Sequence, residues 1–281
     1  MKRTIESALR LQKTPAGKIL AALEQGQHVT LRGLQEAAKS FLMSHIFSRQ
    51  TRPLIAVLPT EKEALTFYQD CRVFLDQSHV LRYPAWNIMT TDFLVPQKET
   101  AMDRLRVLTH LLQGRKMLVV TSLPALIQNC IPRSVFEEYS FTLAMGDTID
   151  GESLAEKLVL MGYTRQTLVE ERGDFSIRGH IVDLFPPHSP TPFRMERMGD
   201  EIESIRRFDS VSQRSIEEIV DFQITAASEL ILTENRRKMA GRNTRIRATD
   251  LELPRRIKDP LMETIDSGLL ASLNPMYLPL F

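Results

Sequence analysis

This chain of 281 residues contains only two cysteines and one tryptophan, and its net charge is close to zero. The two cysteines, Cys71 and Cys130, stand far apart and form no C-x-x-C pair, which argues against a cysteine-based metal or redox site and predicts buried free thiols. The six histidines show no metal-ligand spacing, so we expect no metal ion. With 36 basic and 35 acidic residues, the net charge of +1 provides no overall field that attracts nucleic acid or membrane.

Long apolar runs are absent as well. No run approaches the roughly 18 residues of a membrane-spanning helix, and the N-terminal stretch lacks the apolar core of a secretory signal. We therefore expect a cytoplasmic protein with no membrane partner. The length allows roughly two domains. The chain ends on an apolar, aromatic segment, residues 275–281, which is unusual for a natural terminus and predicts a cut inside a domain.

Strands and helices alternate over the N-terminal half of the sequence. Pro53–Leu58 is a continuous apolar run typical of a buried parallel strand, and Thr60 with Glu63 forms a capping box before the next helix. The periodicity predicts strands over 28–33, 53–58, 80–83 and 116–121, and helices over 5–11, 16–23, 35–47, 61–75 and 99–113. This alternation indicates an α/β fold with an open, mostly parallel sheet of the Rossmann or phosphate-loop type.

The segment between the first predicted strand and its helix reads G-L-Q-E-A-A-K-S. It matches the phosphate-loop pattern G-x-x-x-x-G-K-[ST] at Gly33, Lys39 and Ser40. Ala38 replaces the second glycine, which lets the backbone wrap the phosphates, and Glu36 adds a negative charge. No acidic pair at a strand end offers a magnesium ligand. We expect a degenerate loop without cofactor or ATP hydrolysis; a surviving anion site is the less favoured alternative.

From residue 134 onwards the pattern changes to short strands. A strand-rich stretch over 136–143 and a short helix over 151–162 precede a β-meander in an inserted α+β domain. The strands of the meander are predicted at Ser176–Phe185, Phe193–Met198 and Glu201–Phe208, with a turn at Gly199-Asp200.

Side chains alternate along the second of these strands. Arg194, Glu196 and Met198 therefore share one face, while Phe193 and Met195 take the core face. An unpaired arginine beside apolar neighbours on a short strand is unusual. Because arginine binds carboxylates bidentately and is enriched at interface hot spots, Arg178 and Arg194 are candidate partner contacts. A structural salt bridge, for example from Arg194 to Glu196 or Asp183, is the alternative.

After Ser228 the sequence is helical and basic. Nine basic residues against two acidic ones give residues 236–258 a local net charge of +7. The candidate phosphate contacts are Arg236, Arg237, Lys238, Arg242 and Arg245. A solvated helix face is the favoured interpretation, since no aromatic residues are interleaved. The lone tryptophan, Trp86, is interpreted as a core residue rather than as a stacking platform for a base.

The motifs of the meander follow one another in a recognisable order: G-[DE]-[FY]-x-x-R-G-x-x-x-D-[LI]-F-P, then P-x-R, then D-E-I-[ED]-S-[IL]-R-x-F-D, then S-Q-R. This order resembles domain 2 of the bacterial transcription-repair coupling factors (Mfd), and it is similar to the matching domain of the excision-repair protein UvrB. The residues that carry the resemblance are Gly173, Asp174, Phe175, Arg178, Gly179, Asp183, Leu184, Phe185, Pro186, Pro192, Arg194, Asp200–Arg206, Phe208, Asp209 and Ser212–Arg214. A weaker similarity extends over essentially the whole chain.

The resemblance implies three domains: a UvrB-like domain 1a over 1–133, a UvrA-binding domain 2 over 134–226, and an incomplete domain 1b over 227–281. It implies that UvrA docks on Arg178, Arg194, Glu196 and Met198. The sequence departs from the family at Arg197-Met198, where many members carry two aromatics.

For the full-length protein, the resemblance implies RNA polymerase and DNA as further partners. It also implies an ATP-driven motor outside this segment and a C-terminal domain that masks the UvrA surface. The damage-probing hairpin of UvrB is expected to be missing between Trp86 and Gln97, where Phe93 is the one aromatic residue. The segment is thus predicted to be a non-catalytic, UvrA-recruiting module. A non-specific DNA-binding module and an active ATP-dependent DNA-processing domain are the alternatives, and the second is disfavoured by Ala38 and Glu36.

Overall fold

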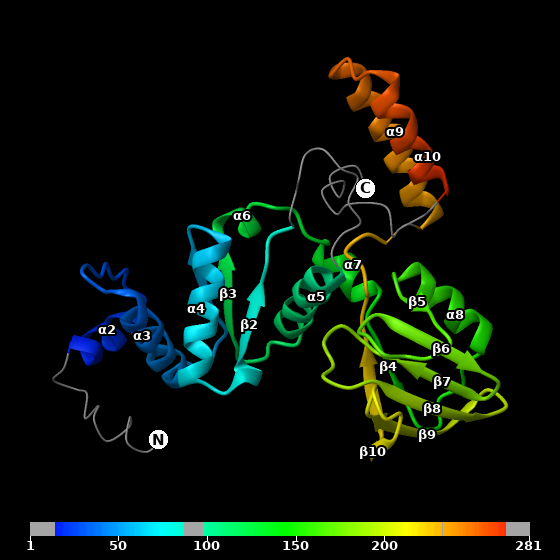
Figure 1. The fold of residues 1–281 in the computed structure, drawn as a ribbon, viewed down its shortest axis with the longest axis horizontal. Coiled ribbons are helices and arrows are strands. Elements are labelled where there is room, and N and C mark those ends of the chain that lie inside the picture. The colour runs from blue at the N-terminus through cyan, green and yellow to red at the C-terminus, as the bar shows by residue number, and fades with distance from the viewer. Residues whose placement is uncertain (1–14, 87–97, 232, 268–281) are drawn as a thin grey trace.

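The computed structural model describes residues 15–86, 98–231 and 233–267. Within these residues the protein is a mixed α/β structure with three sheets, one of them parallel and two wholly or mainly antiparallel. Figure 1 shows the parallel sheet and the six-stranded sheet side by side, with a helical hairpin projecting from the region between them. No helix in the described part of the chain is both long and apolar enough to cross a bilayer.

The parallel sheet has three strands in the order β1-β3-β2. Its strands are β1 (Leu54–Leu58), β2 (Val80–Tyr83) and β3 (Leu118–Ser122). Helix α4 (Glu61–Phe74) covers one face, and helix α5 (Lys98–Leu112) packs on the other face over β2 and β3. Thr60 caps α4 by accepting a hydrogen bond from the Glu63 N–H at 3.2 Å, as the capping-box sequence predicts.

Shorter elements complete this half of the chain. Helices α2 (Pro15–Glu24) and α3 (Glu36–Arg49) precede the sheet, and α3 packs on α4. A 3₁₀ turn, η2 (Gln77–His79), leads into β2, and α6 (Leu123–Leu126) and α7 (Arg133–Glu138) follow β3.

The larger sheet has six strands in the order β10-β9-β8-β7-β6-β5. The strands are β5 (Thr164–Arg165), β6 (Asp174–Arg178), β7 (Ile181–Leu184), β8 (Phe193–Met198), β9 (Glu201–Phe208) and β10 (Ser215–Ile219). All neighbouring pairs are antiparallel except β5 with β6. Helix α8 (Gly151–Leu160) and a two-stranded sheet, β4 (Phe141–Ala144) with β11 (Asp221–Ile224), pack against its inner face.

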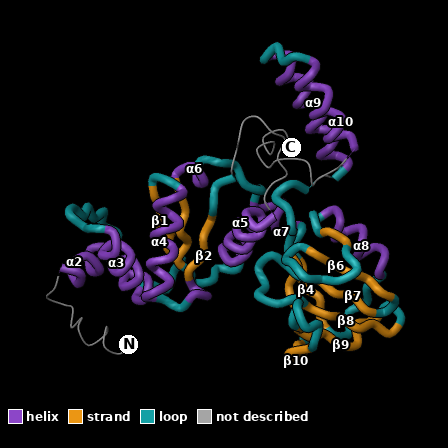
Figure 2. The backbone as a smooth tube through the Cα atoms, viewed as in Figure 1, coloured by secondary structure: helices purple, strands orange, loops and turns teal. Residues whose placement is uncertain are grey.

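Buried and more exposed side chains alternate along β8 as the sequence predicts. Phe193 and Met195 are buried in the main core cluster together with Ile205 of β9 and Leu158 of α8. This core also takes in Leu105 of α5, so α5 belongs to both halves of the molecule. Figure 2 shows α5 lying between the two sheets.

A buried ion pair links the parallel-sheet half of the molecule to the segment that follows the antiparallel sheets. Arg104 of α5 donates from Nε to Oε1 of Glu229 at 2.5 Å, and both side chains are completely buried. The same guanidinium donates to the carbonyl oxygen of Pro84 at 3.0 Å and lies over the rings of Tyr83 and Trp86, at 4.2 and 5.1 Å from their centroids. Trp86 is therefore a core residue, as the favoured interpretation held.

Beyond Glu229 the chain forms an antiparallel helical hairpin. Its helices are α9 (Glu234–Asp250) and α10 (Arg255–Ser267). They pack on each other through small residues of α9, and Figure 1 shows the pair rising away from both sheets.

Three predictions about secondary structure are wrong. Residues 28–33 form no strand and are exposed, because no neighbouring strand pairs with them in the described part of the chain. The predicted single strand Ser176–Phe185 is the hairpin of β6 and β7, since Gly179 adopts a positive φ of 59° and turns the chain. The stretch 136–143 begins inside helix α7 before β4 starts. The predicted helix over 5–11 and the connection with Phe93 lie outside the described residues.

Candidate docking face on the six-stranded sheet

Four antiparallel strands bring the predicted site residues onto one face. The register aligns Ser176, Asp183, Arg194 and Arg206 in a row across β6, β7, β8 and β9. A second row runs through Arg178, Ile181, Glu196 and Ser204. Directly paired residues point to the same side of a sheet, and residues two apart on one strand share that side. We call this side, opposite α8, the outer face.

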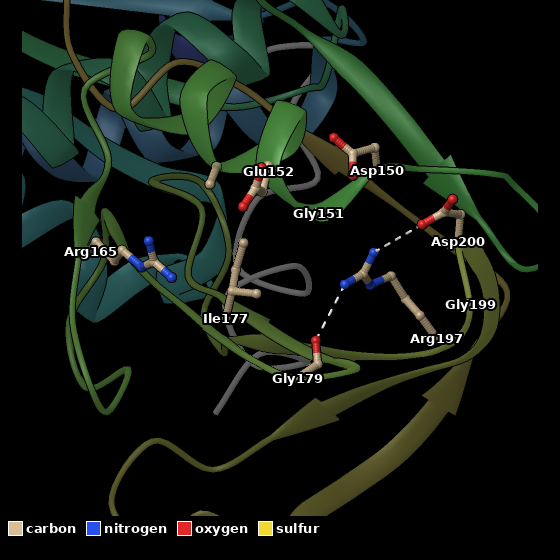
Figure 3. A pocket seen from close by; sticks show the side chains of 10 residues that line it. Asp150, Gly151, Glu152, Arg165, Ile177, Gly179, Arg197, Gly199 and Asp200 are labelled. Carbon is tan, nitrogen blue, oxygen red and sulfur yellow. Dashed lines mark hydrogen bonds and ion pairs between the residues drawn. The ribbon is translucent and has the colours of Figure 1, made fainter.

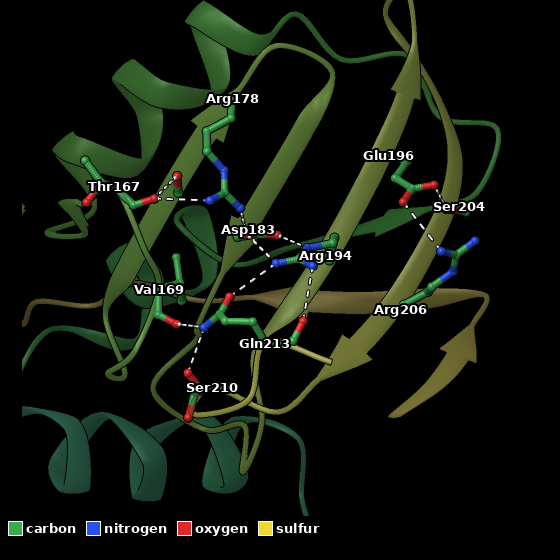
Figure 4. A network of polar contacts seen from close by, with 11 residues as sticks. Thr167, Val169, Arg178, Asp183, Arg194, Glu196, Ser204, Arg206, Ser210 and Gln213 are labelled. Atoms are coloured by element: carbon green, nitrogen blue, oxygen red, sulfur yellow. Dashed lines mark hydrogen bonds and ion pairs between the residues drawn. The ribbon is translucent and has the colours of Figure 1, made fainter. Parts of the chain in front are cut away.

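Asp183 is the centre of the outer face. Its completely buried carboxylate accepts from Nη2 of Arg178 at 2.6 Å, and from Nε and Nη2 of Arg194 at 2.7 and 2.9 Å (Figure 4). An isolated buried carboxylate is strongly unfavourable, and these charge-assisted hydrogen bonds compensate for its burial. The structure thus selects Asp183 as the salt-bridge partner of both arginines.

Arg194 is occupied by contacts within the domain. It is 19% exposed, and besides Asp183 it donates to the side chain and the backbone carbonyl of Gln213 at 3.3 and 3.4 Å. Its guanidinium also lies 4.5 Å from the centroid of the Phe208 ring. The hydrogen bonds to Asp183 raise the pKa of Arg194 above its ordinary value. The contacts of Arg194 within the domain therefore occupy most of its donor groups.

Gln213 takes part in these contacts. Its backbone has a positive φ of 59°, and its amide donates to the carbonyl oxygens of Val169 and Ser210 at 3.2 and 2.7 Å. It fastens the β9–β10 connection to Arg194 and to the loop that precedes β6. Gln213 of the S-Q-R motif thus has a structural role, which no local pattern indicates.

The remaining site residues are more open. Arg178 keeps 44% of its side chain exposed, and Met198 is 73% exposed. Glu196 accepts from Ser204 at 3.1 Å and from Arg206 at 3.5 Å, with about a third of its side chain exposed (34%). The outer face therefore exposes a cation, Arg178, an anion, Glu196, and an apolar side chain, Met198.

Arg197 points the other way, into the domain. Its side chain is 9% exposed and donates to the carbonyl oxygens of Ile149 and Gly179 at 3.1 and 3.3 Å. It packs so closely on the first turn of α8 that a Cβ on Gly151 would lie 2.7 Å from its Nη2. Arg197 also lines a hollow of about 430 Å³ together with Asp150, Glu152, Arg165 and Asp200. Figure 3 shows these side chains. Of the Arg197-Met198 pair, Met198 is the residue whose side chain is exposed on the outer face.

The degenerate phosphate-loop sequence lies far from this face, and its geometry differs from the expected strand–turn–helix. Gly33 is exposed with a φ of 79°, and no strand precedes it within the described residues. Ser40 is completely buried, and its hydroxyl donates to the carbonyl oxygen of Ala37 at 3.2 Å. Ala38 and Lys39 are exposed on the first turns of α3.

Comparisons with known proteins find a family match over the region that contains the six-stranded sheet. Residues 141–230 match the family model described as the UvrB interaction domain. Curated relatives named transcription-repair-coupling factor match most of the chain: 34% identity over 247 residues in Myxococcus xanthus, 33% over 245 in Staphylococcus aureus strain Mu50 and 30% over 243 in Staphylococcus haemolyticus. The matches cover 85%, 86% and 86% of this chain. This chain is related to the transcription-repair-coupling factors. It spans about a fifth (21%) of the length of these relatives.

The family match covers the outer face but not the basic segment. Residues 141–230 include every strand of the six-stranded sheet and end before α9.

In this relative of the transcription-repair-coupling factors, the basic candidates are dispersed along α9. Arg236 and Arg237 are half-buried, Lys238 pairs with Glu234 at 2.6 Å, and Arg242 and Arg245 are exposed. The structure thus separates them from the docking face.

Proposed function

We propose that this chain is the UvrA-docking module of a transcription-repair-coupling factor. The match of residues 141–230 to the UvrB interaction domain is the observation that carries the proposal. The outer face adds support, because it combines a half-exposed arginine, Arg178, with an exposed apolar side chain, Met198. Hot spots of protein interfaces commonly combine these residue classes.

Within this proposal, the site residues divide their tasks. Arg178, Glu196 and Met198 contact UvrA directly, and Arg194 holds Asp183 and Gln213 so that Arg178 is correctly placed. Arg178 has one donor group committed to Asp183 and the carbonyl of Thr167 as a distant second acceptor at 3.4 Å. Its remaining N–H groups suit a carboxylate of the partner.

We propose the domain boundaries 1–133, 134–226 and 227–281 for this module, with residues 134–226 as its UvrA-binding domain. RNA polymerase and DNA are partners of the longer protein, whose motor and masking domain lie outside this chain. The proposed module itself has no catalytic activity. Support for this comes from Ala38 in the phosphate-loop sequence and from the buried Ser40, which does not present its hydroxyl to a nucleotide-bound magnesium ion.

A titration of UvrA tests the docking role. We expect Arg178→Ala to weaken UvrA binding by about 30- to 800-fold, or roughly 2–4 kcal/mol, with little loss of thermal stability, because Arg194 still compensates Asp183. Arg194→Ala weakens binding and stability together. The matched control is Arg133→Ala, an 80% exposed arginine on α7. Equal binding by wild type, Arg178→Ala and Met198→Ala would show that UvrA docks elsewhere.

Calorimetry with magnesium and ATP tests the non-catalytic assignment. We expect no saturable binding tighter than about 100 µM, which corresponds to roughly −5.5 kcal/mol. Ala38→Gly does not restore hydrolysis, because it supplies neither the strand before the loop nor an acidic magnesium ligand. Measurable turnover by this variant would contradict the assignment.

A further inference from the structure

The charge of the basic segment is distributed unevenly between the two helices of the hairpin. Residues 235–249 of α9 include six cations and no acid. Helix α10 carries three cations and three acids, Asp259, Glu263 and Asp266. The +7 of residues 236–258 therefore overstates the charge of the hairpin, since α10 brings these acids alongside α9. The excess positive charge belongs to α9.

Packing fixes which face of α9 points outwards. Ala240, Gly241, Thr244 and Ala248 are buried, and the Met262 side chain of α10 lies against Gly241. On a helix of 3.6 residues per turn, these residues define one stripe. Arg242 lies nearly opposite this stripe, whereas Arg245 and Arg247 lie on either side of it. All three arginines are exposed. Among the described residues, the side chains of these three arginines take part in no ion pair or hydrogen bond.

We propose that the outward face of α9, with Arg242 near its centre and Arg245 and Arg247 on its two flanks, binds the phosphate backbone of a nucleic acid. Five of the six cations in the acid-free stretch are arginines, whose planar guanidinium groups bind phosphate oxygens in pairs. The stretch is about 22 Å long, which matches about six base pairs along a duplex axis. A contact of this kind reads charge and not sequence.

An acidic protein helix fits this surface less well. Met239 and Ile246 are the exposed apolar residues of the outward face, 47% and 48% exposed, and they are two turns apart with Arg242 between them. A helix-in-groove partner needs apolar anchors every three or four residues, and this face lacks such a stripe. The surface is also separate from the outer face of the six-stranded sheet, so it goes beyond the proposed UvrA-docking role.

Fluorescence anisotropy with the whole chain and a labelled 20-base-pair duplex of random sequence tests the proposal. At about 50 mM salt, we expect Arg242→Glu/Arg245→Glu/Arg247→Glu to bind at least about tenfold more weakly than wild type. The slope of log K against log salt becomes shallower by about 3, because each phosphate that the variant no longer neutralises contributes about 0.9 to the slope. The neutral triple Arg→Gln variant at the same positions gives an intermediate weakening of binding.

The matched control reverses three exposed cations in the other half of the chain, Lys18→Glu/Arg52→Glu/Lys62→Glu. It changes the net charge equally, and we expect it to keep the affinity within about threefold and the salt slope of wild type. Circular dichroism melts confirm that all variants fold. Equal weakening in both triples, or wild-type binding by the α9 triple, overturns the proposal. Displacement of the duplex by polyglutamate at equal charge concentration overturns it too, because the face would then be a general acidic-protein site.

Discussion

Ile55, Val119 and Leu81 form one row across the parallel sheet, and Asp183, Arg194 and Arg206 form one row across the antiparallel sheet. In the first row α5 covers Val119, which is 3% exposed, but leaves Ile55 53% exposed. In the second row, hydrogen bonds and ion pairs satisfy the polar side chains without any covering helix among the described residues.

The difference follows from how each kind of sheet is normally covered. Parallel sheets are buried on both faces by helices, so their strands are apolar throughout. Antiparallel sheets keep one face open to water and alternate apolar with polar residues. A continuously apolar strand therefore predicts a sheet that helices cover on both faces. A strand that alternates apolar and polar residues predicts a sheet with one face open to water. In this chain the second kind of face carries the proposed docking site.

The largest expected effect comes from removing the buried Arg104–Glu229 ion pair, which links the parallel-sheet half of the molecule to the antiparallel-sheet half. We expect Arg104→Met to reduce the free energy of unfolding by about 3–5 kcal/mol, because it leaves the Glu229 carboxylate buried without a counter-charge. Denaturant titration measures the reduction. The double variant Arg104→Met/Glu229→Met recovers most of it. The control Arg133→Met removes an exposed pair with Glu137 and costs less than about 1 kcal/mol; an equal cost for both single variants would contradict the assigned role.

A second test uses pH. Burial, together with nearby positive groups, lowers the pKa of His188 to about 4, and burial likewise lowers the pKa of His110 on α5. Since the unfolded chain takes up protons on these side chains below about pH 6.5 and the folded chain does not, stability is complete above that pH and is lost as the pH falls towards 4. We expect His188 to account for about 3 kcal/mol of this effect.

Thermal melts at successive pH values measure the effect. His188→Gln flattens the acid side of the stability profile, and the exposed control His180→Gln leaves it as in wild type. An unchanged slope in His188→Gln would assign the acid sensitivity to other groups.

The smallest expected effect sharpens the comparison within one row of the parallel sheet. Val119→Thr places a hydroxyl under α5 and is expected to cost about 1–3 kcal/mol. Ile55→Thr, its direct neighbour across the sheet, is expected to cost less than about 1 kcal/mol because half of that side chain already meets water. Equal costs would mean that Ile55 is covered in solution.

Several elements were predictable from local pattern. Strands β2, β8 and β9 have the predicted bounds, because alternation, β-branched residues and the Gly199-Asp200 turn act over a few neighbouring positions. The N-cap of α4 was predictable for the same reason. The strand predicted at 28–33 failed because a strand also requires a partner, which periodicity does not reveal. The motif order led to the family, and the match over residues 141–230 confirms that resemblance.

By itself, the sequence determined the mixed α/β class, the core face of β8, and the candidate pair Arg178 and Arg194. Only the tertiary structure decided how these arginines differ. Asp183 lies directly across from Arg194 in the sheet, and Gln213 reaches Arg194 from a loop nineteen residues further along the chain. The pairing of Arg104 with Glu229, 125 residues apart, likewise arises only when three segments meet. Short-range patterns encode which face a side chain takes, whereas its partners depend on which distant segments pack against that face.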